Sequence, residues 1–452
     1  MSAPQADRVW RYHVHAGPGA RELSVHAELP AGVPAVLGVD DFAHPFLRDL
    51  EVATERGWQT VGRTGRRWLV PRCRERGCYL RYTYRLGEAA ERIDRFAYAG
   101  YRASALMAPP STFLLAPQDY SGSDLYRARI DTAPGESFVS GVYRDASTGA
   151  LMAPARVLFQ APYSGFGRFE RETLHVGASA IELALAPDHE RLRVTRPGLR
   201  GALARAAAAV QRYYGRFPVP QVTLIVLPTP GAGIMGMQLG NGGASIVLFL
   251  GEDADDATLA RDWVLVHELL HLGVPTLERE HSWIAEGLAT YQEPLVRARA
   301  GLIGEPDVWR AFLRGMPQGL PAGADGGLDG SERWGRTYWG GALVFLLLDL
   351  ELRTRTHGRI SLDDAAREIL RRGGDTMVRW SLRQTLRAGD SALDRASLSA
   401  SYDRFAFTPV AVDLGALFQR LGVRMAGDEV LFDERAELAG VRRALVARAR
   451  PL

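Results

Sequence analysis

The chain has 452 residues, of which 46% are hydrophobic, and a formal net charge of +3 at pH 7. That length and apolar content can supply two or three hydrophobic cores. The small net charge gives no reason to expect a nucleic acid or an acidic surface as a partner. The longest clear apolar run, residues 342–348, is far too short to span a membrane, so no transmembrane segment is expected.

The N-terminal residues 1–11 lack the apolar stretch of a signal peptide. We therefore expect a cytoplasmic protein if Met1 is the native start, and a periplasmic or secreted one if a signal peptide has been removed. The two cysteines, Cys73 and Cys78, flank four residues that could form a hairpin turn. A disulfide across this turn would indicate an oxidising compartment, whereas two reduced thiols beside a strand fit equally well.

Short alternating strands and glycine- or proline-rich turns fill the first part of the chain. The pattern predicts an antiparallel β-sandwich domain over residues 1–194. This region has no histidine cluster and no nucleophile motif, so we interpret it as a scaffold. The strands expected in it are residues 21–29, 67–70, 79–86, 113–116 and 180–186.

The remainder predicts an α/β catalytic domain over residues 195–303 and a mostly helical domain over residues 304–452. The whole chain is therefore expected to be an α+β multidomain protein. The elements expected in these two regions are a helix at 199–216, strands at 221–227 and 244–250, and helices at 343–353, 361–372 and 434–448.

A glycine-rich segment, residues 233–245, has two interpretations. A phosphate cradle is disfavoured, because the segment lacks the Lys-Ser/Thr ending of a P-loop and the spacing of a dinucleotide fingerprint. The favoured alternative is an edge strand, formed by residues 244–250, along which glycines let an extended peptide approach the backbone. The substrate-binding candidates in this segment are Gln238, Asn241, Gly242 and Gly243.

The sequence His-Glu-Leu-Leu-His at positions 267–271 carries the chemistry. On the helix expected over residues 255–272, His267 and His271 lie on one face and can bind the same zinc ion. Glu268 can then reach a zinc-bound water without being a ligand. The alternative is a helix whose histidines lie at a wet surface and bind nothing. The apolar neighbours disfavour it, because buried histidines and a buried glutamate need partners.

A second helix is expected over residues 282–301, starting with Ser282 as its N-cap and kinked at Pro294. Its Glu286 is the candidate third ligand, which leaves one zinc position open for catalysis. Glu293 lies on the same face and either accepts a hydrogen bond from the ring N–H of a ligand histidine or is part of a solvated face. His281 is interpreted as a loop or pocket histidine, since a fourth protein ligand would close the site.

These residues predict hydrolysis by a metal-activated water. A single Zn²⁺ ion would activate the water and polarise the carbonyl, while Glu268 takes the proton and passes it to the leaving amine. The oxyanion then needs a second stabiliser beside the metal. Tyr338 fits that role, because it precedes the apolar run 342–348 and is followed by glycines that allow close approach.

The zinc helix, the Trp-Ile-Ala-Glu-Gly sequence at 283–287 and the Tyr338 block together resemble the gluzincin zinc metallopeptidases. Among these, the chain is most similar to the glycyl aminopeptidase family, a distant relative of aminopeptidase N. The resemblance covers about residues 255–370 and includes Ser-Leu-Asp-Asp at 361–364. It implies a thermolysin-like catalytic domain with Glu268 as general base and Tyr338 as transition-state stabiliser. The zinc ligands it implies are His267, His271 and Glu286.

Two features depart from that pattern. Fourteen residues, 272–285, separate the second histidine from Glu286, and this shorter spacing argues against the aminopeptidase N branch. The strand before the zinc helix also lacks the glutamate that binds the substrate amine in aminopeptidases of this clan. Gln238 and Asn241 are the nearest polar replacements, and a neutral amide cannot neutralise an ammonium group.

Three functions follow as hypotheses, each with a peptide or protein as partner. The resemblance implies a metallo-aminopeptidase that prefers small N-terminal residues. The missing glutamate favours a metallo-endopeptidase or oligopeptidase on the same scaffold. A non-catalytic peptide-binding protein is the third, disfavoured because the expected catalytic set is complete. The sequence does not define an oligomeric state.

Overall fold

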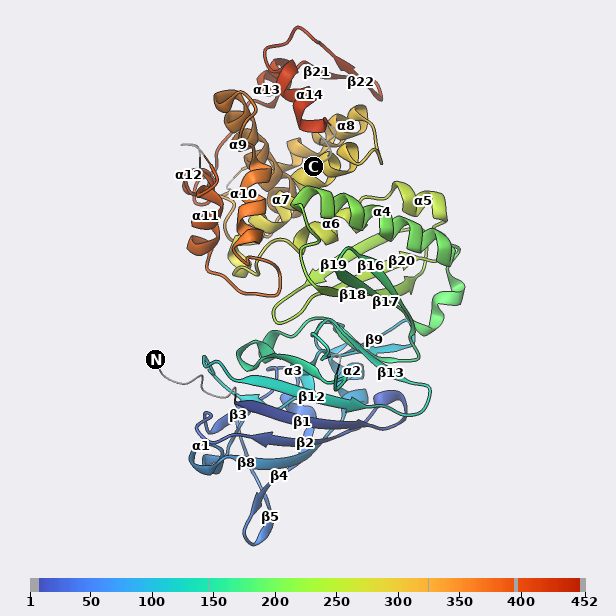
Figure 1. The fold of residues 1–452 in the computed structure, drawn as a ribbon, viewed down its shortest axis with the longest axis vertical. Coiled ribbons are helices and arrows are strands. Elements are labelled where there is room, and N and C mark those ends of the chain that lie inside the picture. The colour runs from blue at the N-terminus through green and yellow to red at the C-terminus, as the bar shows by residue number, and fades with distance from the viewer. Residues whose placement is uncertain (1–7, 146, 324, 394–396, 448–452) are drawn as a thin grey trace. The chain divides into compact units, whose positions relative to one another are not determined.

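A computed structural model describes residues 8–145, 147–323, 325–393 and 397–447 (Figure 1). The protein is a mixed α+β chain with several sheets and many helices. Its contacts divide it into two compact units. The first unit contains the residues described up to His175, together with Ala180–Arg193 and Gln221–Ala254. The second contains Val176–Ser179, Val194–Pro220 and the residues described from Asp255 onward.

The predicted domains 1–194, 195–303 and 304–452 are continuous segments, whereas each of these two units combines several segments of the chain. The predicted division stays a prediction. Within the described part of the chain, no helix is both long enough and apolar enough to cross a membrane.

A seven-stranded sheet forms the largest layer of the first unit, in the order β14-β12-β1-β2-β8-β4-β5 (Figure 1). All its neighbouring strands are antiparallel except β1 and β12, which are parallel. The predicted antiparallel pairing therefore holds for this sheet except between β1 and β12, because alternation indicates which face of a strand is buried but not the direction of its partner. The strands are β1 (Val9–Ala16), β2 (Leu23–Leu29), β4 (Leu47–Thr54), β5 (Gly57–Thr60), β8 (Cys78–Tyr84), β12 (Leu125–Asp131) and β14 (Leu151–Pro154).

Two four-stranded sheets complete the N-terminal part of this unit. The first has the order β13-β15-β10-β9, with strands β9 (Gly100–Arg102), β10 (Ala105–Met107), β13 (Ser137–Ser140) and β15 (Ser164–Gly167). The second has the order β11-β3-β7-β6, with strands β3 (Val36–Gly38), β6 (Arg63–Thr64), β7 (Arg67–Leu69) and β11 (Ala116–Pro117).

Short helices join these strands: α1 (Pro71–Arg76), α2 (Leu86–Ile93) and α3 (Pro110–Phe113). The strand predicted at 113–116 is only partly present: Phe113 ends α3, which starts at Pro110, and Ala116 is the first residue of the short strand β11. Turns of 3₁₀ helix occur at η1 (Pro18–Ala20), η2 (His44–Phe46), η3 (Ala155–Gln160) and η4 (Pro187–Arg191) in this unit, and at η5 (Arg279–His281) and η6 (Met316–Gly319) in the second.

The two cysteines are joined by a disulfide, so of the two alternatives the structure contains the oxidised form. The four residues between them do not form a hairpin turn as predicted. They continue α1 through Arg76, and Gly77, with φ of 79°, reverses the chain into β8.

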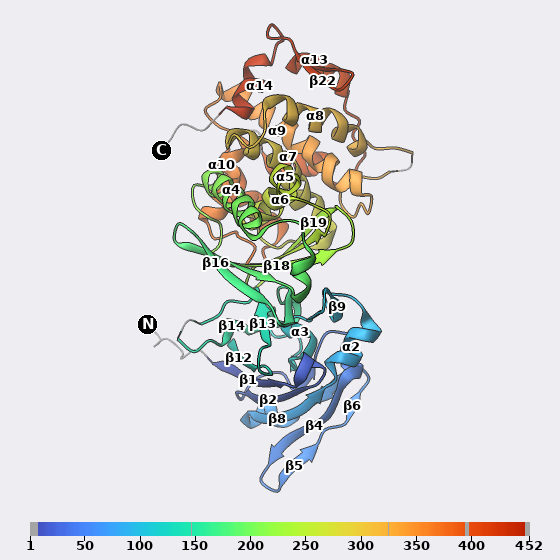
Figure 2. The ribbon, with the colours of Figure 1, turned by 90° about the vertical axis from the view of Figure 1, so that its right-hand side faces the viewer.

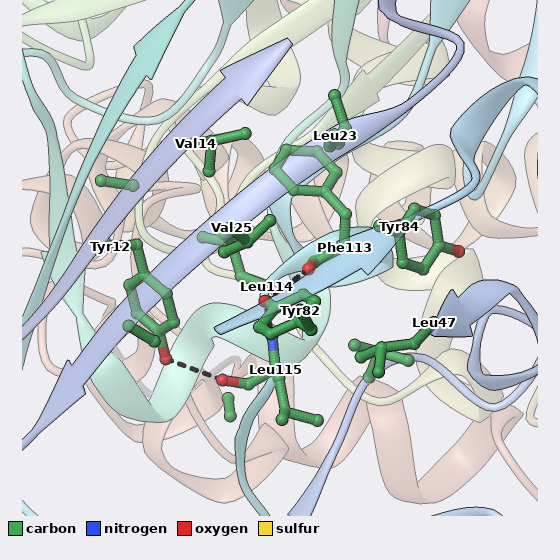
Figure 3. Packing of buried hydrophobic residues seen from close by; sticks show 14 of the residues in the cluster. Tyr12, Val14, Leu23, Val25, Leu47, Tyr82, Tyr84, Phe113, Leu114 and Leu115 are labelled. Carbon is green, nitrogen blue, oxygen red and sulfur yellow. Dashed lines mark hydrogen bonds between the residues drawn. The ribbon is translucent and has the colours of Figure 1, made fainter. Parts of the chain in front are cut away.

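Buried tyrosines tie the core of the first unit to a loop (Figure 3). The Tyr82 hydroxyl donates to the Phe113 carbonyl at 2.8 Å and accepts from the Leu115 N–H at 2.9 Å. The Tyr12 hydroxyl donates to the Leu115 carbonyl at 3.0 Å. These bonds satisfy backbone groups that would otherwise be buried without partners.

Tyr82→Phe is expected to destabilise the protein by about 1–3 kcal/mol, because it leaves the Phe113 carbonyl and the Leu115 N–H unsatisfied in the core. The matched control is Tyr79→Phe on the same strand, where the ring is 59% exposed and the change should be within about 0.5 kcal/mol. Urea unfolding followed by tyrosine and tryptophan fluorescence measures both. Equal stabilities of the two variants would contradict the assignment.

A five-stranded sheet also belongs largely to the first unit, in the order β16-β17-β18-β20-β19. Strands β17, β18 and β20 are parallel to one another, and β19 is an antiparallel edge strand. Every residue of β20 is buried, so the predicted edge strand at 244–250 is instead internal, as its continuous apolar sequence allows. The strands are β16 (Glu170–Val176), β17 (Ser179–Leu185), β18 (Gln221–Thr229), β19 (Ile234–Leu239) and β20 (Ser245–Gly251).

Helices make up most of the second unit, with α4 packed against α6 and α10 (Figure 2). They are α4 (Arg196–Tyr214), α5 (Asp256–Arg261), α6 (Val264–His271), α7 (Ser282–Arg299), α8 (Glu305–Gly315), α9 (Gly341–Thr356), α10 (Leu362–Arg371), α11 (Leu382–Asp390), α12 (Leu398–Phe405), α13 (Leu414–Leu421) and α14 (Ala439–Val446). A hairpin of β21 (Val423–Ala426) and β22 (Glu429–Phe432) lies between the last two.

The expected helix over residues 255–272 is two helices. Asp262 is extended, and its carboxylate accepts from the Val264 N–H at 2.8 Å, which ends α5 and starts α6. Ser282 is the first residue of α7 and not its N-cap. The helices expected at 343–353 and 361–372 are confirmed as α9 and α10. The helix expected at 434–448 corresponds to the shorter α14, and residue 448 of the expected range lies outside the described residues.

Helices α7 and α9 approach each other at two glycines. A Cβ atom on Gly287 would collide with the Cα of Gly341, and one on Gly341 would collide with the Trp283 carbonyl. Only glycine at these two positions permits this separation of the helix axes. The close approach sets the position of the turn that precedes α9 relative to the first turns of α7.

Candidate metal centre

Helices α6 and α7 bring three metal-binding side chains together. His267 and His271 are one turn apart on α6, and their Nε2 atoms are 3.2 Å apart. Oε2 of Glu286, from α7, is 3.3 Å from each of these nitrogens. The predicted ligand residues therefore converge on one point with their donor atoms facing one another.

A zinc ion fits this arrangement. Two ligand atoms that are each about 2.1 Å from a tetrahedral zinc ion are about 3.4 Å apart, close to the separations observed here. Two imidazole nitrogens that face each other inside a protein need either a shared proton or a cation between them. Two histidines and one carboxylate are also a donor set that suits zinc.

The charges of the three groups are coupled. Burial alone would raise the pKa of Glu286, but His271 and His267 outweigh it and hold that pKa well below its usual value. Burial would lower the pKa of His271, but the Glu286 carboxylate raises it to about 8. Burial lowers the pKa of His267. The carboxylate is thus ionised, and one imidazole can carry a proton that balances its charge. A bound cation would take the place of that proton.

Aromatic rings fix the orientation of His267. Trp263 lies edge-on at 5.0 Å between ring centroids, and Tyr338 stacks at 6.0 Å with an interplanar angle of 12°. The His267 Nδ1 atom is buried and, among the described residues, has no hydrogen-bond partner. Ring packing, and not a hydrogen bond to Nδ1, therefore holds this imidazole.

Tyr338 lies in a π-helical turn, η7 (Arg336–Gly340), directly before α9. Such turns are rare and are often found at functional sites. Burial raises the pKa of Tyr338, and the carboxylates of Glu286 and Glu268 raise it further, with a hydrogen bond between Tyr338 and Glu286. The phenol is therefore fully protonated at neutral pH and can donate a hydrogen bond.

Glu268 is also part of this cluster. Its side chain is buried, with 6% of the residue exposed, and its charge acts on both His271 and Tyr338. The structure thus gathers the three predicted ligands, the predicted base and the predicted tyrosine within the second unit.

Glu293 is buried, so the alternative of a solvated helix face is wrong. Its Oε1 accepts from Arg297 Nη1 at 2.8 Å. Its observed partner is therefore this arginine, and a contact with a ligand histidine stays a prediction. Burial raises the pKa of Glu293 to about 7 in spite of Arg297.

His281 lies outside the ligand cluster, as predicted. Its Nδ1 is 3.0 Å from Oδ2 of Asp329, whose Oδ1 accepts from Trp283 Nε1 at 2.7 Å. The Tyr402 hydroxyl also donates to Asp329. Sequence reasoning missed Asp329, which fixes the start of α7 by accepting from two residues at that end of the helix.

The predicted substrate-binding residues lie in the first unit. Gln238 is on the edge strand β19, and Asn241 is buried with its side-chain amide donating to the Gln160 carbonyl at 3.3 Å. Gly242 has a φ of 82°, and a Cβ on Gly243 would collide with the Gly141 carbonyl. These contacts explain the two glycines structurally, and the substrate-binding role of all four residues stays a prediction.

A cavity of about 570 Å³ adjoins His267. Trp263, Trp334 and Trp339 line it together with Tyr338, and the rings of Trp263 and Trp334 are 42% and 54% exposed. Sequence reasoning missed this cavity. A signal was present, because Trp263 precedes His267 by four residues and Trp334 precedes Tyr338 by four, which puts each pair on one helix face.

Comparison with known proteins places this fold. No protein-family model matches the chain, and no curated protein matches it by sequence. Among solved structures, an aminopeptidase N family protein from Idiomarina loihiensis aligns with a TM-score of 0.70 and 15% identity over 92% of this chain and 78% of that chain. An M1 zinc metallopeptidase from Deinococcus radiodurans aligns with a TM-score of 0.56 and 16% identity over 90% and 94%.

A mutant of the Deinococcus radiodurans enzyme bound to a Tyr-Ser-Ala substrate aligns similarly, with a TM-score of 0.56 and 18% identity over 90% of this chain and 95% of that chain. The protein thus has the fold of the aminopeptidase N-like M1 zinc metallopeptidases, and the expected distant likeness to aminopeptidase N is confirmed at the level of fold. The shorter segment between His271 and Glu286 does not exclude that fold, because the connecting loop still lets the ligands meet.

The wild-type protein is expected to bind one zinc ion per chain. His271→Ala and Glu286→Ala should each weaken zinc affinity by more than about 100-fold, since each removes a donor atom. His281→Ala is the matched control and should keep the wild-type affinity. Competition with a chromogenic chelator measures all four. Unchanged affinity in either ligand variant would contradict the assignment.

The stability of the protein should carry a pH-dependent contribution from Glu293. Its folded-state pKa of about 7 exceeds the ordinary value of 4.5, so the folded state holds this proton more tightly than the unfolded state. The contribution is fully present below about pH 4.5 and is lost as the pH rises through 7. Glu293→Gln should therefore gain stability relative to wild type between pH 5 and pH 8, by about 2–3 kcal/mol.

Urea unfolding of metal-free wild type and variant at both pH values measures this difference. Glu429→Gln, at an exposed position of the same unit, is the control and should differ from wild type equally at both pH values. A Glu293→Gln difference that does not change with pH would show that Glu293 is ionised throughout.

Proposed function

We propose that this protein is a zinc-dependent peptidase. The observation that carries the proposal is the convergence of His267, His271 and Glu286, with separations that match a tetrahedral zinc ion. Glu268 and Tyr338 beside it provide a base and a hydrogen-bond donor. The M1 zinc metallopeptidase fold of the solved relatives supports the same reaction.

Zinc, when bound, supplies Lewis-acid activation of water and of the substrate carbonyl. Glu268 is the general base that accepts the proton of the attacking water on its carboxylate. The same carboxyl group then donates this proton to the nitrogen of the leaving amine. Since Glu268 is buried beside the ligands, its carboxylate is shielded from bulk water during both transfers.

Tyr338 donates a hydrogen bond to the oxygen that becomes negatively charged when the carbonyl is attacked. Its raised pKa keeps the hydroxyl proton in place at neutral pH. The ring is held between His267 and Trp334, with the Trp334 centroid at 5.0 Å. This packing fixes the donor before the reaction, so little reorganisation is needed in the transition state.

For the substrate we propose a peptide with a free N-terminus, with a small N-terminal residue, as the resemblance to the glycyl aminopeptidase family implies. The cavity beside His267 is large enough for one larger substrate side chain, which would belong to the residue that follows the scissile bond. Its volume of about 570 Å³ lies within the range of pockets that hold small organic molecules. Its tryptophans favour an apolar or aromatic side chain.

The zinc-loaded protein is expected to cleave a peptide with a free N-terminus and to release its first residue. Glu268→Gln should lower kcat by about 10²–10⁴-fold, because it removes the base and leaves the three ligands in place. Its zinc content should remain that of wild type. Mass spectrometry of the products, with metal analysis of the same samples, measures both.

The acetylated form of the same peptide is the substrate control, and Glu351→Gln, at an exposed position of α9, is the variant control. Internal cleavage of both peptides would contradict the aminopeptidase assignment and would show that the protein is an endopeptidase. Full activity of Glu268→Gln would refute the mechanism. Cleavage of neither peptide by the zinc-loaded wild type would favour a peptide-binding protein.

A further inference from the structure

A second cavity, of about 210 Å³, lies in the helical unit and is lined by a different set of residues from the metal centre. It is bounded by side chains of α4, α7, α9, α10 and α14. Four of its twelve lining residues are arginines, and they come from four different helices: Arg212, Arg299, Arg353 and Arg367.

Two carboxylates face these arginines. Asp363 lines the cavity, accepts from Arg299 Nη1 at 2.8 Å and lies 3.9 Å from Arg353 Nη2. Asp349 accepts from Arg353 Nε at 3.1 Å and from the Tyr291 hydroxyl at 2.7 Å. Both carboxylates are therefore already engaged, and they balance only two of the four guanidinium groups.

The other two arginines carry the excess positive charge. Arg367 donates through Nε to the Tyr213 carbonyl at 2.7 Å, which is a neutral partner. Arg212 and Arg367 are both exposed at the mouth of the cavity, and neither forms an ion pair with any residue that the structure describes. Two like charges beside a cavity favour a negatively charged occupant.

Two residues that line the cavity also carry buried hydrogen-bond donors that lack partners within the described parts of the chain. The donors are Nη2 of Arg299 and the hydroxyl of Tyr213, a residue that is 5% exposed. Burial and the Asp363 carboxylate raise the pKa of Tyr213, while Arg299 and Arg367 oppose that shift, so the hydroxyl is protonated at neutral pH. Leaving such donors unsatisfied is costly, and an acceptor in the cavity would remove this cost.

We propose that this cavity binds a small oxyanion of the phosphate or sulfate class. Guanidinium groups recognise such oxyanions through paired charge-assisted hydrogen bonds. The cavity, at about 210 Å³, is smaller than the roughly 300 Å³ at which pockets for organic ligands begin. A compact tetrahedral anion therefore suits it better than a nucleotide or a peptide.

Such an anion would tie four helices together, because its donors come from α4, α7, α9 and α10. Helix α7 also carries Glu286, so the anion site and the metal centre share one helix. The proposal does not depend on peptidase activity, since it rests on the charges and unsatisfied donors of the cavity alone.

Thermal unfolding and calorimetric titration of the full zinc-loaded protein with inorganic phosphate test this site. At 10 mM phosphate, and with ionic strength held constant by sodium chloride, the Tm should rise by about 3 °C or more. Arg212→Gln combined with Arg367→Gln should abolish this rise and weaken Kd at least about tenfold. Arg205→Gln, an exposed arginine on the same helix as Arg212, is the matched control and should keep the full response.

Ala444→Glu provides a second variant that leaves the arginines intact. It puts a carboxylate at an exposed position that lines the cavity, so it should compete with phosphate and reduce the rise in Tm. A rise of equal size in wild type, the double variant and Ala444→Glu would refute the site. No rise beyond that given by sodium chloride would show that the cavity holds only water.

Discussion

The need to satisfy two buried imidazoles and one buried carboxylate is the constraint on which the helical unit depends. His267, His271 and Glu286 come from two helices and meet with no more than 3.3 Å between neighbouring donor atoms. Without a proton or a cation between them, this arrangement would place unpaired polar groups in the protein interior. The apolar remainder of α6 holds the histidines at that position, and a proton or a bound cation between the three groups would make the position favourable.

The geometry of the centre also depends on backbone packing. Gly287, one residue after the candidate third ligand Glu286, meets Gly341 at the start of α9, and the π-helical turn before Gly341 presents Tyr338 to Glu286. Any side chain at either glycine would separate α7 from α9 and move the phenol away from the ligands. Buried polar contacts elsewhere, such as those of Asp329 with His281 and Trp283, fix the start of α7 in the same way.

Sequence reasoning predicted which side chains the structure brings together at the candidate metal centre, because helical periodicity is local. His267, Glu268 and His271 lie within two turns, and Glu286 and Tyr338 were identified from short motifs. It did not find Asp329, the tryptophan-lined cavity or the arginine cavity, because these depend on residues from several helices meeting in space. The break at Asp262 was missed because one side-chain hydrogen bond decides it. The parallel pairing of β1 with β12 was missed because alternation carries no information on strand direction.

The most direct test of the account is zinc K-edge X-ray absorption of the protein loaded with one equivalent of zinc. The account predicts two imidazole nitrogens and one or two oxygens at about 2.0–2.1 Å, with no sulfur in the coordination sphere. A spectrum with fewer than two imidazoles, or one that is unchanged when His271 is replaced by alanine, would contradict the assignment of the metal centre and the mechanism built on it.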